Sequence, residues 1–96
     1  MLDDIEYRYH NTMHRRHRRT LATIFDKQTR GNLKWKDVEA MFRSLDAAIH
    51  ERRGSSVIIE LNGEVETVHR PHPRPECGKG LVKRMRSFLE RAGVAP

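Results

Sequence analysis

Cysteine and long apolar runs are nearly absent from this chain of 96 residues. Cys77 is its only cysteine, so no internal disulfide can form, and a reducing compartment is the simpler setting. No apolar run approaches the roughly 20 residues that a membrane-spanning helix needs. The acidic, polar start MLDDIEYRYH lacks the basic and apolar regions of an export signal. We therefore expect a soluble protein of the cytoplasm, with no membrane partner.

Positive charge is abundant and gathers in two places. A core of this size buries only about 60–65% of the surface of the unfolded chain, which indicates one small domain without a large enclosed active site. The formal net charge is +6. Residues 14–19 carry four arginines, and residues 79–91 carry five cations beside one glutamate, whereas residues 32–68 are slightly acidic. Such clusters are typical of nucleic-acid-binding surfaces, although solvated helix faces give the same pattern.

Apolar residues at helical spacing predict three helices. The first is a basic helix over about residues 15–26, preceded by a loosely held extension without a clear period over residues 1–13. The second lies in KWKDVEAMFRSLD and the third in KGLVKRMRSFLERA, where Gly93 follows as a C′ stop. The apolar faces of the three helices are expected to form much of the core: Leu21, Ile24, Phe25, Trp35, Val38, Met41, Phe42, Leu45, Leu81, Val82, Met85, Phe88, Leu89 and Ala92.

Short β-branched runs between the second and third helices predict three strands, in AAIHER, SSVIIEL and EVETV. Asn62 and Gly63 join the last two strands and indicate a tight hairpin, because both central residues of a type I′ turn need positive φ. The order of elements predicts an α+β sandwich, with helices on one face of a small antiparallel meander. The other face of the sheet would be open to solvent or to a ligand.

The hairpin also predicts which residues face one another. If Asn62 and Gly63 are the two loop residues, Ser56 lies directly opposite His69, and opposed residues share one face of a sheet. A slip of one residue would send His69 to the other face. The hypothesis of a Ser56–His69 site therefore depends on an unshifted register.

The segment HRPHP contains His69 and His72, and the residues alone leave their role open. They can be structural, with the two prolines around His72 ending the strand and fixing the route into the last helix. A metal site would pair them with Glu76 or Cys77, but a structural zinc site needs four ligands at closed spacing, so we expect no metal. In the third interpretation the two histidines act as general acid and base, which also requires a substrate bound beside them.

Four segments, taken in order, point to a family. They are KWKDVE at 34–39, RGSSV at 53–57, HRPHP at 69–73, and KG at 79–80 before a helix that ends in RAGV at 91–94. In order and spacing they resemble the HicA toxins of bacterial type II toxin-antitoxin modules. The resemblance implies a double-stranded-RNA-binding-like α-β-β-β-α fold over residues 32–96, with residues 1–31 as an N-terminal extension that carries the extra basic helix. It also implies mRNA interferase activity without metal or cofactor, and a HicB-like antitoxin through which oligomers would form.

One departure from the family concerns catalysis. In the family a Gly-Ser pair is followed by the histidine assigned to catalysis, and here that position is Ser56, whereas the Pro-x-His motif is approximately kept at His72. A serine hydroxyl cannot act as a general acid or base near neutral pH. Either His69 has taken over this role, or the chain is a weakened or silent relative that binds RNA or the antitoxin without cutting.

RNA cleavage by the 2′-OH needs a base, an acid and a cation near the phosphate, for which His69, His72 and Arg70 or Lys79 are the candidates. The arginines of the first helix and the cations of the last are the natural partners of the RNA backbone. The residues expected to contact RNA are Arg15, Arg16, Arg18, Arg19, Arg70, Lys79, Lys83 and Arg86.

Overall fold

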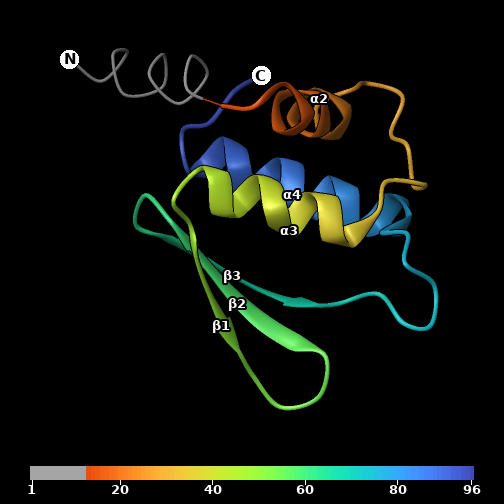
Figure 1. Cartoon of the computed structure of the whole chain (residues 1–96), viewed down its shortest axis with the longest axis vertical. Coiled ribbons are helices and arrows are strands. Elements are labelled where there is room, and N and C mark those ends of the chain that lie inside the picture. The colour runs from red at the N-terminus through yellow and green to blue at the C-terminus, as the bar shows by residue number, and fades with distance from the viewer. Residues whose placement is uncertain (1–12) are drawn as a thin grey trace.

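The computed structural model of the chain describes residues 13–96 (Figure 1). The extension predicted over residues 1–13 lies outside the described residues, apart from Met13, which is buried in the core. The elements follow the predicted order: α2 (Arg15–Ile24), α3 (Trp35–Ser44), β1 (Ala48–Glu51), β2 (Ser56–Leu61), β3 (Glu64–His69) and α4 (Gly78–Arg91). The predicted α+β class is confirmed.

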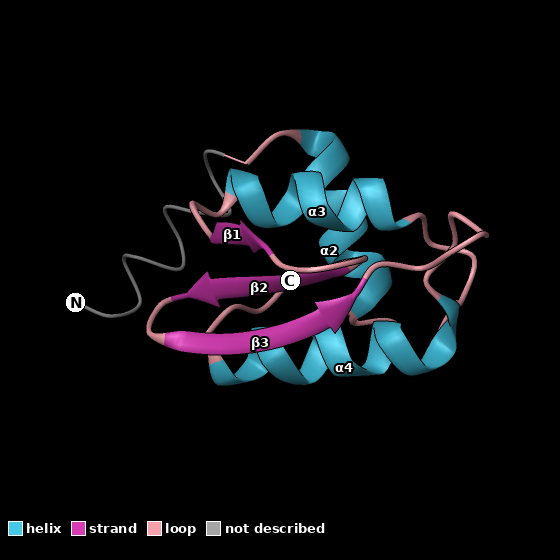
Figure 2. Cartoon of the chain, turned by 90° about the horizontal axis from the view of Figure 1, so that it is seen from below, coloured by secondary structure: helices cyan, strands magenta, loops and turns pink. Residues whose placement is uncertain are grey.

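The elements stack in three layers. The three strands form one antiparallel sheet in the order β1-β2-β3. The helices α3 and α4 cover one face of this sheet, and α2 packs on these helices on the side away from the sheet (Figures 1 and 2). Within residues 13–96 the result is a double-stranded-RNA-binding-like α-β-β-β-α unit preceded by α2. Within residues 13–96, no helix is both long and apolar enough to cross a membrane.

One core holds the layers together. Alternate residues of β2 turn inward, so that Val57, Ile59 and Leu61 are buried. They meet the apolar stripes of α3 and α4, as the helical periods predict. Leu21 and Ile24 of α2 belong to the same cluster, so α2 is an integral part of the fold. The domain boundary at residue 31 stays a prediction.

The hairpin between β2 and β3 has the predicted register. Ser56 pairs with His69, and Leu61 pairs with Glu64. Asn62 and Gly63 have φ of 51° and 83°, the positive values that a type I′ turn requires. The Asn62 side chain also donates a 2.8 Å hydrogen bond from Nδ2 to the carbonyl of Ala92, which anchors the hairpin tip to the end of α4. The register prediction is therefore confirmed.

A pairing that the sequence did not reveal joins the segment before α3 to the segment before α4. The amide of Trp35 donates to the carbonyl of Pro75 at 2.9 Å, and the amide of Cys77 donates to the carbonyl of Leu33 at 2.8 Å. A further 2.8 Å bond runs from the amide of Gly78 to the carbonyl of Gly31. A Cβ atom on Gly31 would lie only 3.0 Å from the backbone nitrogen of Lys79, so this close approach favours glycine.

Candidate active site on the open sheet face

Ser56 and His69 form a hydrogen-bonded pair on the sheet face that the helices leave open. Ser56 begins β2 and His69 ends β3, and the antiparallel register places them side by side. The Ser56 Oγ lies 3.1 Å from the His69 Nδ1, and the tautomer of the imidazole decides which of the two donates. Among residues 13–96, no hydrogen bond involves Nε2 of His69.

Two arginines add positive charge to this pair. Arg52, Arg53, Ser56 and Thr67 line an open hollow of about 430 Å³ beside it. The amide of Arg52 donates to the carbonyl of Ser56 at 2.9 Å, which extends the pairing of β1 and β2 by one step. Sequence reasoning missed both arginines, although extending the strand register past β1 would have placed Arg52 opposite Ser56. A hollow lined by a hydroxyl and two guanidinium groups, with the imidazole of His69 hydrogen-bonded to that hydroxyl, suits a phosphodiester.

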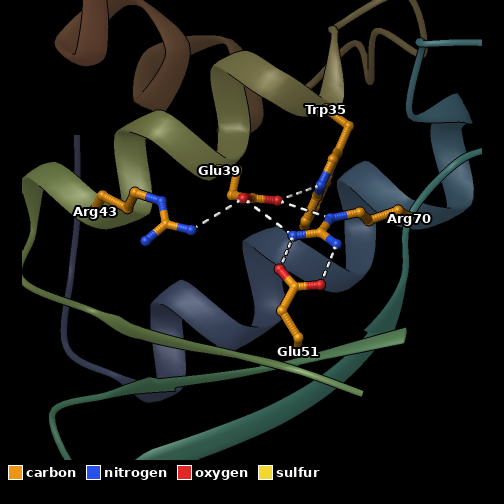
Figure 3. Close-up of polar contacts among 5 residues, drawn as sticks. All are labelled: Trp35, Glu39, Arg43, Glu51 and Arg70. Carbon is orange, nitrogen blue, oxygen red and sulfur yellow. Dashed lines mark hydrogen bonds and ion pairs between the residues drawn. The ribbon is translucent and has the colours of Figure 1, made fainter. Parts of the chain in front are cut away.

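Arg70 follows His69 directly but does not reach into this hollow. Its Nη1 and Nη2 each donate a 2.7 Å hydrogen bond to Glu51 at the end of β1. Its Nε and Nη2 donate to Glu39 of α3 at 3.1 and 3.2 Å (Figure 3). These contacts tie β1, the end of β3 and α3 together. The contacts of Arg70 are those of a structural cation, and its role as a phosphate ligand stays a prediction.

Glu39 is the shared acceptor of this network. It also accepts hydrogen bonds from Trp35 Nε1 at 2.7 Å and from Arg43 at 3.2 Å. Partial burial alone would raise the pKa of Glu39, but the hydrogen bonds from Arg70, Trp35 and Arg43 lower it below its ordinary value. The pKa of Arg70 is raised in turn, first by Glu51 and then by Glu39. The lowered pKa values of Glu39 and Glu51 and the raised pKa of Arg70 keep these three groups ionised at neutral pH.

Residues 35–94 match a protein-family model described as the HicA toxin of bacterial toxin-antitoxin systems. The match covers more than half of the chain. The chain belongs to the HicA toxin family. No curated protein and no solved structure matches it significantly. Family membership makes the protein the toxin of a toxin-antitoxin system, with an antitoxin as partner. The matched segment of this HicA toxin contains the Ser56–His69 pair and both covering helices, whereas α2 precedes it.

His72 lies apart from the pair in the exposed loop after β3. Within residues 13–96, no hydrogen bond or ion pair joins it to Ser56 or His69, so its predicted role as a catalytic partner stays a prediction. The described residues also contain no group of three or more His, Cys, Asp or Glu side chains that could hold a metal ion. Burial and the charge of Asp37 raise the pKa of Cys77 to about 12, which disfavours the thiolate that metals bind.

The predicted RNA-binding cations of this HicA toxin lie in different surroundings. Arg86 is half-buried and donates from Nε to the carbonyl of Ile24 at 2.7 Å, and from Nη2 to the carbonyl of Asp26 at 3.0 Å. It therefore fastens α4 to the end of α2. The other cations of the two helices are exposed, but α2 lies on the far side of the helical layer from the sheet (Figure 1). The exposed cations are Arg15, Arg16, Arg18, Arg19, Lys79 and Lys83.

Proposed function

We propose that this HicA toxin is a metal-independent endoribonuclease that cuts mRNA, with His69 as its general base. The proposal rests on the 3.1 Å contact between Ser56 Oγ and His69 Nδ1 on the open sheet face. The hydroxyl holds the imidazole in one orientation, so that Nε2 faces the substrate. Arg52 and Arg53 supply the positive charge that a crowded phosphate needs.

Cleavage follows from these positions. His69 Nε2 takes the proton of the ribose 2′-OH, whose oxygen then forms a bond to the adjacent phosphorus. The bond from phosphorus to the 5′-oxygen breaks, and that oxygen receives a proton from a second group, for which His72 is the candidate. The products are a 2′,3′-cyclic phosphate and a 5′-hydroxyl. No metal or cofactor takes part in these steps.

The second candidate function is a HicA toxin that binds RNA or its antitoxin without cutting. It is favoured by Ser56 itself, which stands where the family resemblance places the catalytic histidine. His69 also projects from β3 rather than from β2, so it must approach the same phosphate from a different backbone position. In this case the imidazole beside Ser56 would only stabilise the strand ends.

Four purified forms distinguish the two functions: the parent, Ser56→His, Ser56→Ala and His69→Ala. RNA cleavage is measured with a chelator present, after circular dichroism has shown equal folding. If His69 is the base, His69→Ala abolishes cleavage and Ser56→Ala lowers it modestly. If the site is vacant, His69→Ala behaves like the parent and Ser56→His raises cleavage by about 10²- to 10⁴-fold. Loss of the parent's activity in chelator would bring back a metal mechanism.

The antitoxin in this proposal is an acidic, HicB-like protein that binds the basic toxin in the cytoplasm, where mRNA is available. Opposite charges would speed their association and close the path to the RNA. We expect the product of the neighbouring gene to co-purify with the toxin and to suppress cleavage. Cleavage that persists at a saturating concentration of that product would exclude it as the antitoxin.

A further inference from the structure

A second hollow lies between α4 and the segment that connects α2 to α3. Its volume is about 530 Å³, and it is more polar in its lining than the hollow beside Ser56. Five of its seven lining residues are cationic and none is acidic. One wall precedes the family match and the other belongs to it. The lining residues are Lys27, Gln28, Thr29, Arg30, Lys79, Lys83 and Arg86.

The protein leaves much of the positive charge of this hollow uncompensated. Among residues 13–96, no carboxylate forms an ion pair with any of its three lysines. Arg30, which also lines the hollow, pairs with Asp26. Some arginines elsewhere are likewise neutralised, since Arg43 and Arg70 pair with Glu39 and Arg84 pairs with Glu66. Lysine ammonium groups gathered in this way repel one another, and an anion between them removes the repulsion.

The two walls of the hollow are fixed to one another. Arg86 of α4 donates to Thr29 Oγ1 at 2.9 Å, in addition to its bonds to the two carbonyl groups near the end of α2. The amide of Gly78 donates to the carbonyl of Gly31, which directly follows Arg30 in the connecting segment. The lysines therefore stand on a rigid support, and binding an anion would order few further residues.

We propose that this hollow binds a backbone phosphate of the RNA, as a second contact outside the cleavage site. The inference rests on the proposed function. The hollow adjoins the start of α4, at the same end of the molecule where β2 begins and β3 ends (Figure 2). A strand whose scissile phosphate lies at His69 can continue round this end to the hollow. The same path leads onward to the exposed arginines of α2, which the sheet face alone cannot reach.

The test uses a fluorescent 2′-O-methyl RNA oligonucleotide, which lacks the attacking hydroxyl and cannot be cut. Its affinity is measured by anisotropy over a series of salt concentrations for the parent and for Lys27→Gln/Lys83→Gln, which removes one lysine from each wall. We expect the logarithmic salt slope to fall by about 0.7, since the two lysines would hold one phosphate and each lost phosphate contact to a single strand contributes about 0.7. The control is Lys34→Gln/Lys36→Gln, which removes the same charge from exposed positions outside the hollow.

Equal slopes for the two double variants would overturn the proposal, as would a parent that does not bind the oligonucleotide. Polyglutamate is tested as a competing ligand. If it displaces the RNA, and if the Lys27→Gln/Lys83→Gln substitutions lower the affinity for polyglutamate more than the affinity for RNA, the hollow is a site for an acidic peptide instead. The result is separable from the cleavage assay. If the toxin binds RNA through the hollow but cuts none, only the proposed endoribonuclease activity is contradicted. If it cuts RNA but the salt slope does not change, only the proposed phosphate site is contradicted.

Discussion

Arg70 donates two hydrogen bonds of 2.7 Å to Glu51, one to each carboxylate oxygen (Figure 3). This bidentate contact fixes both the orientation of the guanidinium group and its distance from the carboxylate. Because Arg70 is the residue after His69, the contact also fixes where β3 ends. The geometry of the Ser56–His69 pair therefore depends on the residue that follows His69, whose side chain bonds to Glu39 and Glu51.

Replacing Arg70 with glutamine should lower the free energy of unfolding by about 1–2 kcal/mol, because Glu39 then loses its main charged partner in a half-buried position, with solvent screening reducing the effect. Lysine should restore only part of the loss, since an ammonium cannot hold a carboxylate in the same fork. Urea denaturation measures both, with the exposed Arg74→Gln as control. An Arg70→Gln toxin that is as stable as the parent but binds RNA poorly would restore the phosphate-binding role.

The same network predicts how stability depends on pH. The folded protein holds the pKa of Glu39 below its ordinary value, so the unfolded chain binds more protons in the window between the two values. The contribution of ionised Glu39 to the free energy of unfolding should be fully present above about pH 4.5, and it should be lost as the pH drops through the lowered pKa. The Glu39→Gln variant should be less stable at pH 7 and should lose less on acidification. Denaturation at a series of pH values checks this, and parallel curves for the two proteins would contradict it.

The helix that precedes the family match should be required for folding. Ile24 is completely buried, so Ile24→Ala should cost about 2–4 kcal/mol through lost burial and the cavity left behind. Arg18→Ala on the exposed face of α2 is the control and should change stability by less than about 0.5 kcal/mol. Thermal unfolding distinguishes them. If both variants melt like the parent, α2 is a detachable appendage.

The exposed arginines of α2 should contribute to RNA affinity without contributing to catalysis. Changing Arg15, Arg16, Arg18 and Arg19 to glutamine should flatten the salt dependence of binding, because fewer counterions are released from the RNA. Cleavage at saturating RNA should keep its maximal rate, since α2 lies away from the sheet. A salt slope equal to that of the parent would place the RNA elsewhere, and a lower maximal rate would bring α2 into the chemistry.

Sequence patterns predicted the parts of this structure that depend on local periodicity. Asn62 and Gly63 set the hairpin, and a period of two residues then placed Ser56 beside His69. The role of Arg70 could not be read in the same way. Its partners lie 31 and 19 residues away, and they meet it only after α3 has packed on the sheet. A charged side chain near a candidate site looks identical in sequence whether it meets RNA or a glutamate.

The backbone pairing that joins the start of α3 to the start of α4 sets a limit on how far this toxin can be shortened. The carbonyl groups of Gly31 and Leu33 come before the family match, yet they accept the amides of Gly78 and Cys77 within it. A chain trimmed to residue 35 would remove the carbonyl acceptors of both amides. A shortened version of this toxin that keeps both bonds must therefore include Gly31.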